Sequence, residues 1–226
     1  AAPLPVGAAF GTDAVTIAGG QPGASLDVQL TVYGPLANIP SEGAQVPAGS
    51  PVFETITQTV TFDGSGNAST SFAGTKATTA AGAYVAVESN AQVGLFLASS
   101  GTFGRSSETS TRWALPTITT KVSSQLVVVG TSVSDTATLG GVEELLKLAP
   151  GFKVTVTGKA LGPVAPKAGS CEGLDWSSAA TVVTIPATVV TKDGDLANLG
   201  AFKPAVAQCF SYGETVTVTR DQGLRD

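Results

Sequence analysis

The sequence predicts an all-β protein of two tandem sandwich domains, with one short helical insert in the second. Three observations support this: short runs of alternating or β-branched residues, glycine-rich turns between them, and an internal repeat of the whole pattern. Charged residues make up only 13% of the 226 residues, and 27 residues are glycine. Low charge with abundant Thr, Val, Gly and Ser is typical of β-structure.

The first half of the chain contains clear strand patterns. In residues 26–33 every second side chain is apolar, from Leu26 to Val32, so one face is expected to be buried. Residues 55–62 alternate in the same way and run into the turn 63–67, which has the composition of a hairpin. Further strands are expected at 68–72, 83–88 and 106–111.

The second half shows the same kind of pattern with one exception. Residues 142–148 (Val-Glu-Glu-Leu-Leu-Lys-Leu) predict a helix of at most two turns, which Pro150-Gly151 closes. The expected strands are 117–123, 154–157, 180–185, 188–191 and 215–219.

Aligning the chain with itself reveals the repeat. Five blocks recur in the same order: residues 13–17 with 135–139, 22–23 with 150–151, 34–35 with 162–163, 60–64 with 190–194, and 81–84 with 207–210. We therefore expect two homologous domains, residues 1–112 and 113–226, joined by the proline-containing linker 113–116.

The two copies differ at their ends. The candidate strand 117–123 precedes Asp135, whereas the first copy has few residues before Asp13. Conversely, the first copy continues well past Glu88, and the second ends soon after Glu214. Domain 1 is thus expected to lack a first strand and domain 2 a last one. Three explanations remain open: a cut fragment, copies that differ, or strand exchange between neighbouring chains.

The composition also excludes several functions. The chain has no His, so it has no Ser-His-Asp triad and no imidazole metal ligand. Its net charge of −5 argues against nucleic-acid partners, and no apolar run approaches about 18 residues, so membrane insertion is not expected. We expect no cofactor and no enzymatic activity. The start Ala1-Ala2-Pro3 and the absence of Met predict a processed, secreted product.

The two cysteines are Cys171 and Cys209. An even number of cysteines in a chain that looks exported predicts one disulfide. Two free buried thiols are the alternative. A zinc site is disfavoured because two thiolates without histidine leave the metal underligated.

Several stretches resemble tandem Ig-like repeats of actinobacterial cell-surface proteins. They lie at residues 28–35, 79–87, 104–111, 134–141, 169–176 and 205–219. The resemblance implies Ig-like β-sandwich modules in an extracellular stalk or fibre. It implies a structural or adhesin role, self-assembly with other copies or neighbouring repeats, and contact with the cell wall or a host or matrix ligand. Residues 115–119 lack the glycine of a wall-sorting motif, so wall anchoring is not predicted.

A loop beside the first cysteine offers a second function. Glu172, Asp175 and Trp176 combine two carboxylates with an aromatic ring, which suits a sugar-binding platform or a hydrolase pair. The simpler interpretation is a tryptophan packed over the disulfide with two solvated acids. A carbohydrate-binding or S-layer-like module, with Tyr33 and Phe53 as further contacts, is the alternative function.

Two acidic turns have oxygen ligands at alternate positions, residues 63–67 and 193–195. Calcium could use them, but Asx-turns explain both without a metal, so no metal is expected.

The repeated acids Asp13 and Asp135 accompany Thr16 and Thr138. Each acid either promotes a side-chain crosslink, with Thr and Gln as one candidate pair, or caps a strand end.

Overall fold

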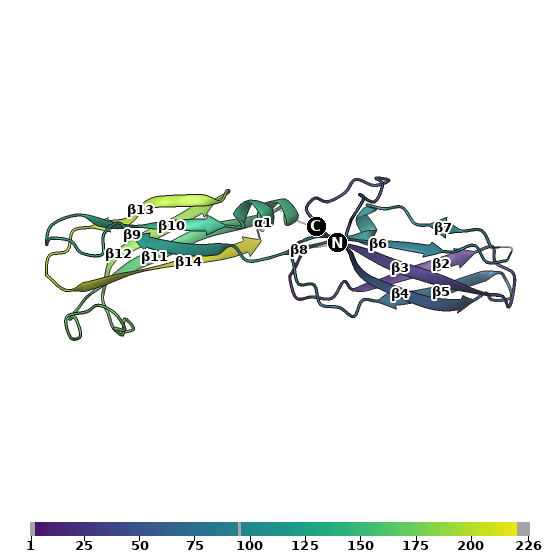
Figure 1. Cartoon of the computed structure of the whole chain (residues 1–226), viewed down its shortest axis with the longest axis horizontal. Coiled ribbons are helices and arrows are strands. Elements are labelled where there is room, and N and C mark those ends of the chain that lie inside the picture. Colours follow the sequence, from purple (N-terminus) through teal and green to yellow (C-terminus); the bar gives the residue numbers. More distant parts are fainter. Residues whose placement is uncertain (1–2, 95, 221–226) are drawn as a thin grey trace. The chain divides into compact units, whose positions relative to one another are not determined.

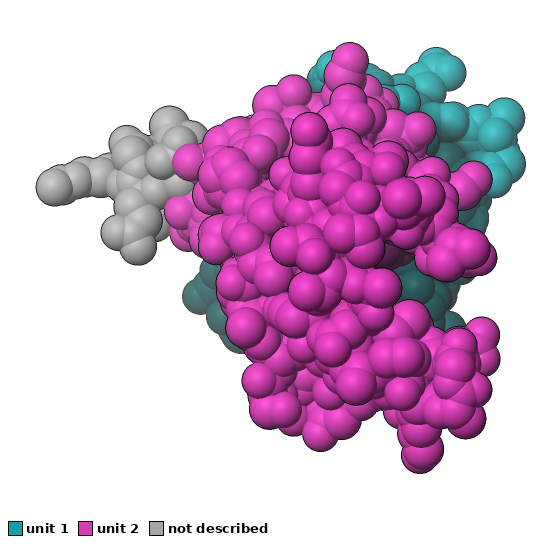
Figure 2. All heavy atoms as spheres, turned by 90° about the vertical axis from the view of Figure 1, so that its left-hand side faces the viewer, with its two compact units in different colours: residues 1–114 teal, residues 115–226 magenta. Residues whose placement is uncertain are grey.

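The structure is a computed structural model that describes residues 3–94 and 96–220. It divides into two compact units, unit 1 (residues 1–114) and unit 2 (residues 115–226), which are coloured separately in Figure 2. Each unit is an Ig-like sandwich of two β-sheets, so the predicted fold class is confirmed. The division lies two residues beyond position 112, because Trp113 still belongs to a strand and pairs with Pro5.

Unit 1 has a larger and a smaller sheet (Figure 1). The larger follows the order β1-β8-β6-β3-β4, with β7 also paired to β6, and the smaller is the pair β2-β5. The elements are β1 (Leu4–Pro5), β2 (Thr12–Ala18), β3 (Ser25–Leu36), β4 (Val52–Thr61), β5 (Asn67–Ala73), β6 (Gly82–Asn90), β7 (Ser99–Ser100), the 3-10 helix η1 (Ser106–Glu108) and β8 (Thr109–Trp113).

Unit 2 consists of two three-stranded sheets, β13-β10-β9 and β12-β11-β14. The elements are β9 (Thr117–Val122), β10 (Val133–Gly140), α1 (Val142–Leu148), β11 (Phe152–Val164), β12 (Thr181–Val190), β13 (Gly194–Phe202) and β14 (Cys209–Arg220). Helix α1 has the bounds that the sequence predicts.

The cores lie between the two sheets of each unit. In β3 the residues from Leu26 to Val32 alternate between buried and exposed, as the sequence pattern requires. Unit 2 buries Val154 and Val156 of β11, and α1 adds Leu145 and Leu148. Full burial of such a side chain contributes about 1.5–3 kcal/mol, so these positions stabilise the sandwiches strongly.

The strand pairing repeats between the units. Strand β3 lies between β4 and β6, and β11 lies between β12 and β14 in the same way. The register also agrees: Leu36 pairs with Ala83 in unit 1, and Val164 pairs with Cys209 in unit 2. The Gly34–Pro35 and Gly162–Pro163 peptide bonds that interrupt β3 and β11 are both cis.

Several sequence predictions about strands were inaccurate. Strands β2, β10 and β13 were not among the expected strands, and β11 and β14 are much longer than the strands expected at 154–157 and 215–219. The separate strands 180–185 and 188–191 form one strand, β12, which tolerates Pro186 because it pairs only with β11 and is an edge strand. The strand expected at 106–111 begins only at Thr109, because η1 occupies residues 106–108.

The ends of the two units differ in pairing. Strand β10 has β13 on one side and β9 on the other, whereas in the described part of unit 1 strand β2 pairs only with β5. Strand β6 has β3 and β8 as neighbours, whereas β14 pairs only with β11 among the described residues.

Candidate functional site: paired carboxyl groups and a disulfide

Three carboxyl groups meet in unit 1. Asp13 lies on the inward face of β2, in step with Val15 and Ile17, because side chains alternate along a strand. Glu88 of β6 and Glu108 of η1 face it, and one oxygen of each of the three carboxyl groups lies within 4.8 Å of the others. The cluster therefore joins the smaller sheet to the larger one.

Burial and mutual repulsion favour the protonated forms of Asp13 and Glu108. Burial first, and then the hydrogen bond with Glu88 and the charge of Glu88, together raise the pKa of Asp13 to about 6. The pKa of Glu108 is also raised, first by burial and then by the charge of Asp13. Asp13 therefore keeps its proton to a higher pH than an ordinary aspartate does.

The same arrangement recurs in unit 2. Asp135 of β10 is 1% exposed and faces Glu214 of β14 across the sandwich. No hydrogen-bond donor among the described residues reaches the buried oxygens of either carboxyl group. Burial and the neighbouring charge of Asp135 raise the pKa of Glu214 to about 7. Because a buried polar group needs a hydrogen-bond partner, the protonated form of Glu214 supplies the donor for its hydrogen bond with Asp135.

Tyr212 lies close to this pair. Its hydroxyl hydrogen-bonds to the backbone oxygens of Val133 and Gly200, at 3.0 Å each. Burial and the charges of Asp135 and Glu214 raise the pKa of Tyr212 to about 12, so the phenol stays neutral. The hydroxyl thereby ties β14 to both β10 and β13.

The sequence pattern points to Asp13 and Asp135 as candidate site residues but not to Glu88 and Glu214. The internal repeat does indicate that the two glutamates are equivalent, because they lie at matching places after the blocks 81–84 and 207–210. Their contact with the aspartates is made between sheets, which strand patterns alone do not reveal.

The threonines that accompany these aspartates in the sequence do not share a face of the strand with them. Thr16 and Thr138 lie three positions after Asp13 and Asp135, so the strand alternation places them on the opposite face. The hydroxyl of Thr138 instead donates to Asp195 at 2.6 Å.

Gln58, a glutamine of the kind that a Thr–Gln crosslink would use, spans the gap between β4 and β5. It accepts a hydrogen bond from the Thr70 hydroxyl, and its amide nitrogen donates to Ser71 O at 3.0 Å.

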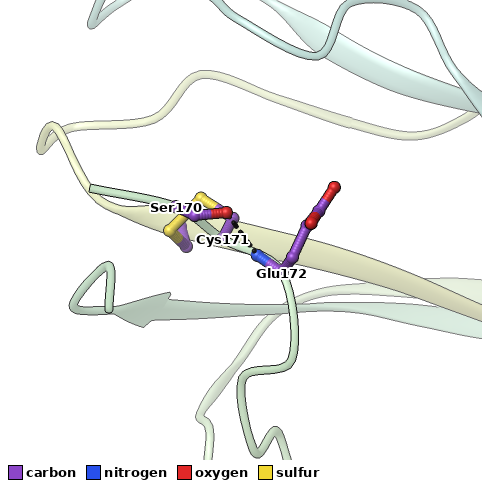
Figure 3. The surroundings of a disulfide bond; sticks show 4 residues. Ser170, Cys171 and Glu172 are labelled. Atoms are coloured by element: carbon purple, nitrogen blue, oxygen red, sulfur yellow. Dashed lines mark hydrogen bonds between the residues drawn. A yellow bond between two sulfur atoms is a disulfide. The ribbon is translucent and has the colours of Figure 1, made fainter. Parts of the chain in front are cut away.

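The predicted disulfide joins Cys171 and Cys209, whose Cα atoms are 5.6 Å apart. Cys209 is the buried first residue of β14, and Cys171 lies in the long loop after β11. Figure 3 shows this loop beside the strand, where the backbone N–H of Glu172 donates to Ser170 Oγ at 3.1 Å. The bond therefore fastens the loop to the start of β14.

The three other predicted site residues follow in the same loop. Glu172 and Asp175 are exposed, and Trp176 is half-buried. Asp175 accepts a hydrogen bond from the Ser177 backbone at 2.9 Å, and this bond lowers its pKa. A glycosidase general acid needs a raised pKa, so Asp175 is poorly suited to that role.

The aromatic residues proposed as further sugar contacts lie on strands rather than in loops. Tyr33 packs edge-on against Phe103 with ring centroids 5.9 Å apart, and Phe53 packs against Tyr84 at 5.1 Å. Carbohydrate binding through Trp176 stays a prediction, but Tyr33 and Phe53 are not part of the proposed binding surface.

The two acidic turns use their carboxylates within the protein. Asp63 Oδ1 accepts hydrogen bonds from the backbone of Ser65 and Asn67, at 2.8 and 2.9 Å. Asp193 Oδ1 accepts from the backbone N–H of Val142 at 2.7 Å. Turn and capping chemistry thus accounts for these acids.

Comparison with known proteins adds little. No protein-family model matches the chain, and no curated protein matches it. Among solved structures, a DUF3823 family protein from Parabacteroides merdae is similar at 12% identity, covering 90% of this chain and 82% of that one, with a TM-score of 0.18. Among the described residues, no helix has the length and apolar character needed to cross a bilayer.

Proposed function

We propose that this chain is a non-enzymatic structural or adhesive module of a bacterial extracellular surface protein, acting as part of a stalk or fibre. The observation that carries the proposal is the repetition of one building plan. Each unit has the same central strand pairing and the same aspartate–glutamate pair between its sheets. Repeated sandwiches with separate cores suit a load-bearing array.

Two further features support this proposal. The Cys171–Cys209 disulfide is compatible with an oxidising compartment outside the cell. Long antiparallel strands, such as β11 paired with β14 from Phe152 to Val164, provide many backbone hydrogen bonds in one sheet. In this role the partners are other copies, neighbouring repeat domains, the cell wall, or a host or matrix ligand.

Surface exposure on living cells tests the proposal. Antibodies raised against the chain should label intact, unpermeabilised cells of the organism that encodes it. Brief trypsin treatment of intact cells should remove the label while leaving a cytosolic marker protein undigested. Labelling that requires cell lysis would contradict an extracellular role.

A further inference from the structure

The free edge of strand β14 corresponds to a paired edge in unit 1. On one side, Val164 of β11 pairs with Cys209, as Leu36 of β3 pairs with Ala83. On the other side, β8 pairs antiparallel with β6, with Thr111 opposite Ala83. Within the described part of unit 2, residues 115–220, no strand takes the place of β8.

The burial of equivalent residues shows the effect of this difference. In β6, Tyr84, Val85 and Ala86 are each 0% exposed. The three residues at the matching places of β14, from Phe210 to Tyr212, are only half-buried. A strand edge with unpaired backbone groups and partly exposed side chains is a template for pairing with another strand.

A groove lies at this edge. Its volume is about 560 Å³, and its walls include residues 209–212 of β14, Val122 of β9, and the segment 124–129 that follows β9. Leu126 and Val129 of that segment are 90% and 46% exposed. Exposed apolar side chains gathered around a groove mark an interaction surface.

The occupant of the matching position in unit 1 indicates what the groove accepts. There, Arg112 of β8 is 0% exposed, and its guanidinium lies 6.0 Å from the centre of the Tyr84 ring. The guanidinium also donates to Ala9 O at 2.8 Å. In unit 2, Phe210 occupies the place of Tyr84 and is one of the residues that line the groove. Its ring packs against Phe202 with ring centroids 5.2 Å apart, so an aromatic ring stands at the position where Tyr84 meets the arginine in unit 1.

We propose that the β14 edge of unit 2 is an acceptor site for an extended strand of a separate polypeptide, with the Ser/Thr-rich, arginine-bearing chemistry of β8. The incoming strand pairs antiparallel with the first residues of β14, as β8 pairs with residues 82–85 of β6, and its arginine lies over Phe210. Backbone hydrogen bonds supply the affinity and the arginine fixes the register. This inference does not depend on the proposed surface role.

A peptide titration tests this site. A fluorescent synthetic peptide of residues 107–114 is added to the full chain, and binding is followed by anisotropy and amide hydrogen exchange. We expect saturable 1:1 binding with new protection at residues 209–212. A peptide carrying Ser110→Pro should not bind, because proline removes a backbone donor and distorts the strand.

Two variants of the chain serve as a matched pair. Val129→Arg in the groove should weaken binding at least about tenfold through repulsion and steric block. Val189→Arg, at a 52% exposed position on β12, should leave binding unchanged. Absence of saturable binding, or binding that neither Ser110→Pro nor Val129→Arg weakens, would overturn the proposal. Concentration-dependent dimerisation that protects residues 209–212, without peptide binding, would assign the groove to a second copy and also overturn it.

Discussion

Asp193 caps the short helix of unit 2 from a distant part of the chain. Its Oδ1 atom lies 2.7 Å from the backbone nitrogen of Val142 and 3.4 Å from that of Glu143. The residue before the helix is Gly141, which has no side chain to cap it. The acid between β12 and β13 therefore supplies the acceptor that the first turn needs.

Replacing this acid should weaken unit 2. Asp193→Ala removes the acceptor, and we expect a loss of about 1–2 kcal/mol in the unfolding free energy of that unit. Chemical denaturation with a probe in each unit measures it. Asp63→Ala is the matched control, since Asp63 occupies the equivalent turn in unit 1 and should affect only unit 1. Equal destabilisation of both units by Asp193→Ala would contradict this explanation.

The paired carboxyl groups predict a pH dependence of stability. The pKa of Glu214 is raised from 4.5 to about 7 in the folded protein, so the folded state binds its proton more tightly than the unfolded state. This contribution to stability is present below about pH 4.5 and is lost as the pH rises through about 7. The melting temperature of unit 2 should therefore fall between pH 5 and pH 8.

Glu214→Gln should flatten this pH dependence, because glutamine does not titrate. Glu172→Gln, at an exposed position in the same unit, should preserve it. Scanning calorimetry at several pH values provides the measurement. A melting temperature of unit 2 that rises over this interval in the wild-type protein would contradict the assignment.

The disulfide should stabilise only unit 2. Cys171→Ser combined with Cys209→Ser opens a loop with a sequence separation of 38 residues. On the chain-entropy model this costs about 4 kcal/mol. We expect a lower transition temperature for unit 2 and an unchanged one for unit 1, and reduction of the wild-type protein should reproduce the result. A similar shift in both transitions would show that the units do not unfold independently.

The buried arginine should be important for unit 1. Arg112 hydrogen-bonds to the backbone oxygens of Ala9 and Phe10, at 2.8 and 3.3 Å, and so joins β8 to the segment before β2. Arg112→Met leaves these oxygens without their donor, with an expected loss of about 2–4 kcal/mol. Arg105→Met, at an exposed position 3.7 Å from Glu42, should change stability by less than about 1 kcal/mol. Equal effects of the two changes would contradict this role.

Local patterns in the sequence predicted much of the fold. The alternation from Leu26 to Val32 identified a buried face correctly, and the apolar spacing of residues 142–148 identified the helix. Strand β13 was not predicted because polar and apolar residues do not alternate regularly in its sequence, Gly-Asp-Leu-Ala-Asn-Leu-Gly-Ala-Phe. Its strand conformation depends on pairing with β10.

The candidate site was harder to predict. The local sequence around Arg112 predicts an exposed strand residue. Arg112 is buried because its guanidinium hydrogen-bonds to backbone oxygens about a hundred positions earlier in the chain. The contact of Asp135 with Glu214 likewise depends on how two sheets pack. The alternation along each strand predicts which side chains face the other sheet. It does not predict which of them contact each other.

The disulfide also limits how far the protein can extend under load. The two cysteines lie 38 positions apart, which corresponds to roughly 130 Å of extended chain at about 3.5 Å per residue. A pulling force that unfolds oxidised unit 2 cannot release this length, whereas reduction makes it available. Unit 1 contains no cysteine and releases its full length when it unfolds. The redox state of one bond therefore sets the extensibility of one unit and leaves that of the other unchanged.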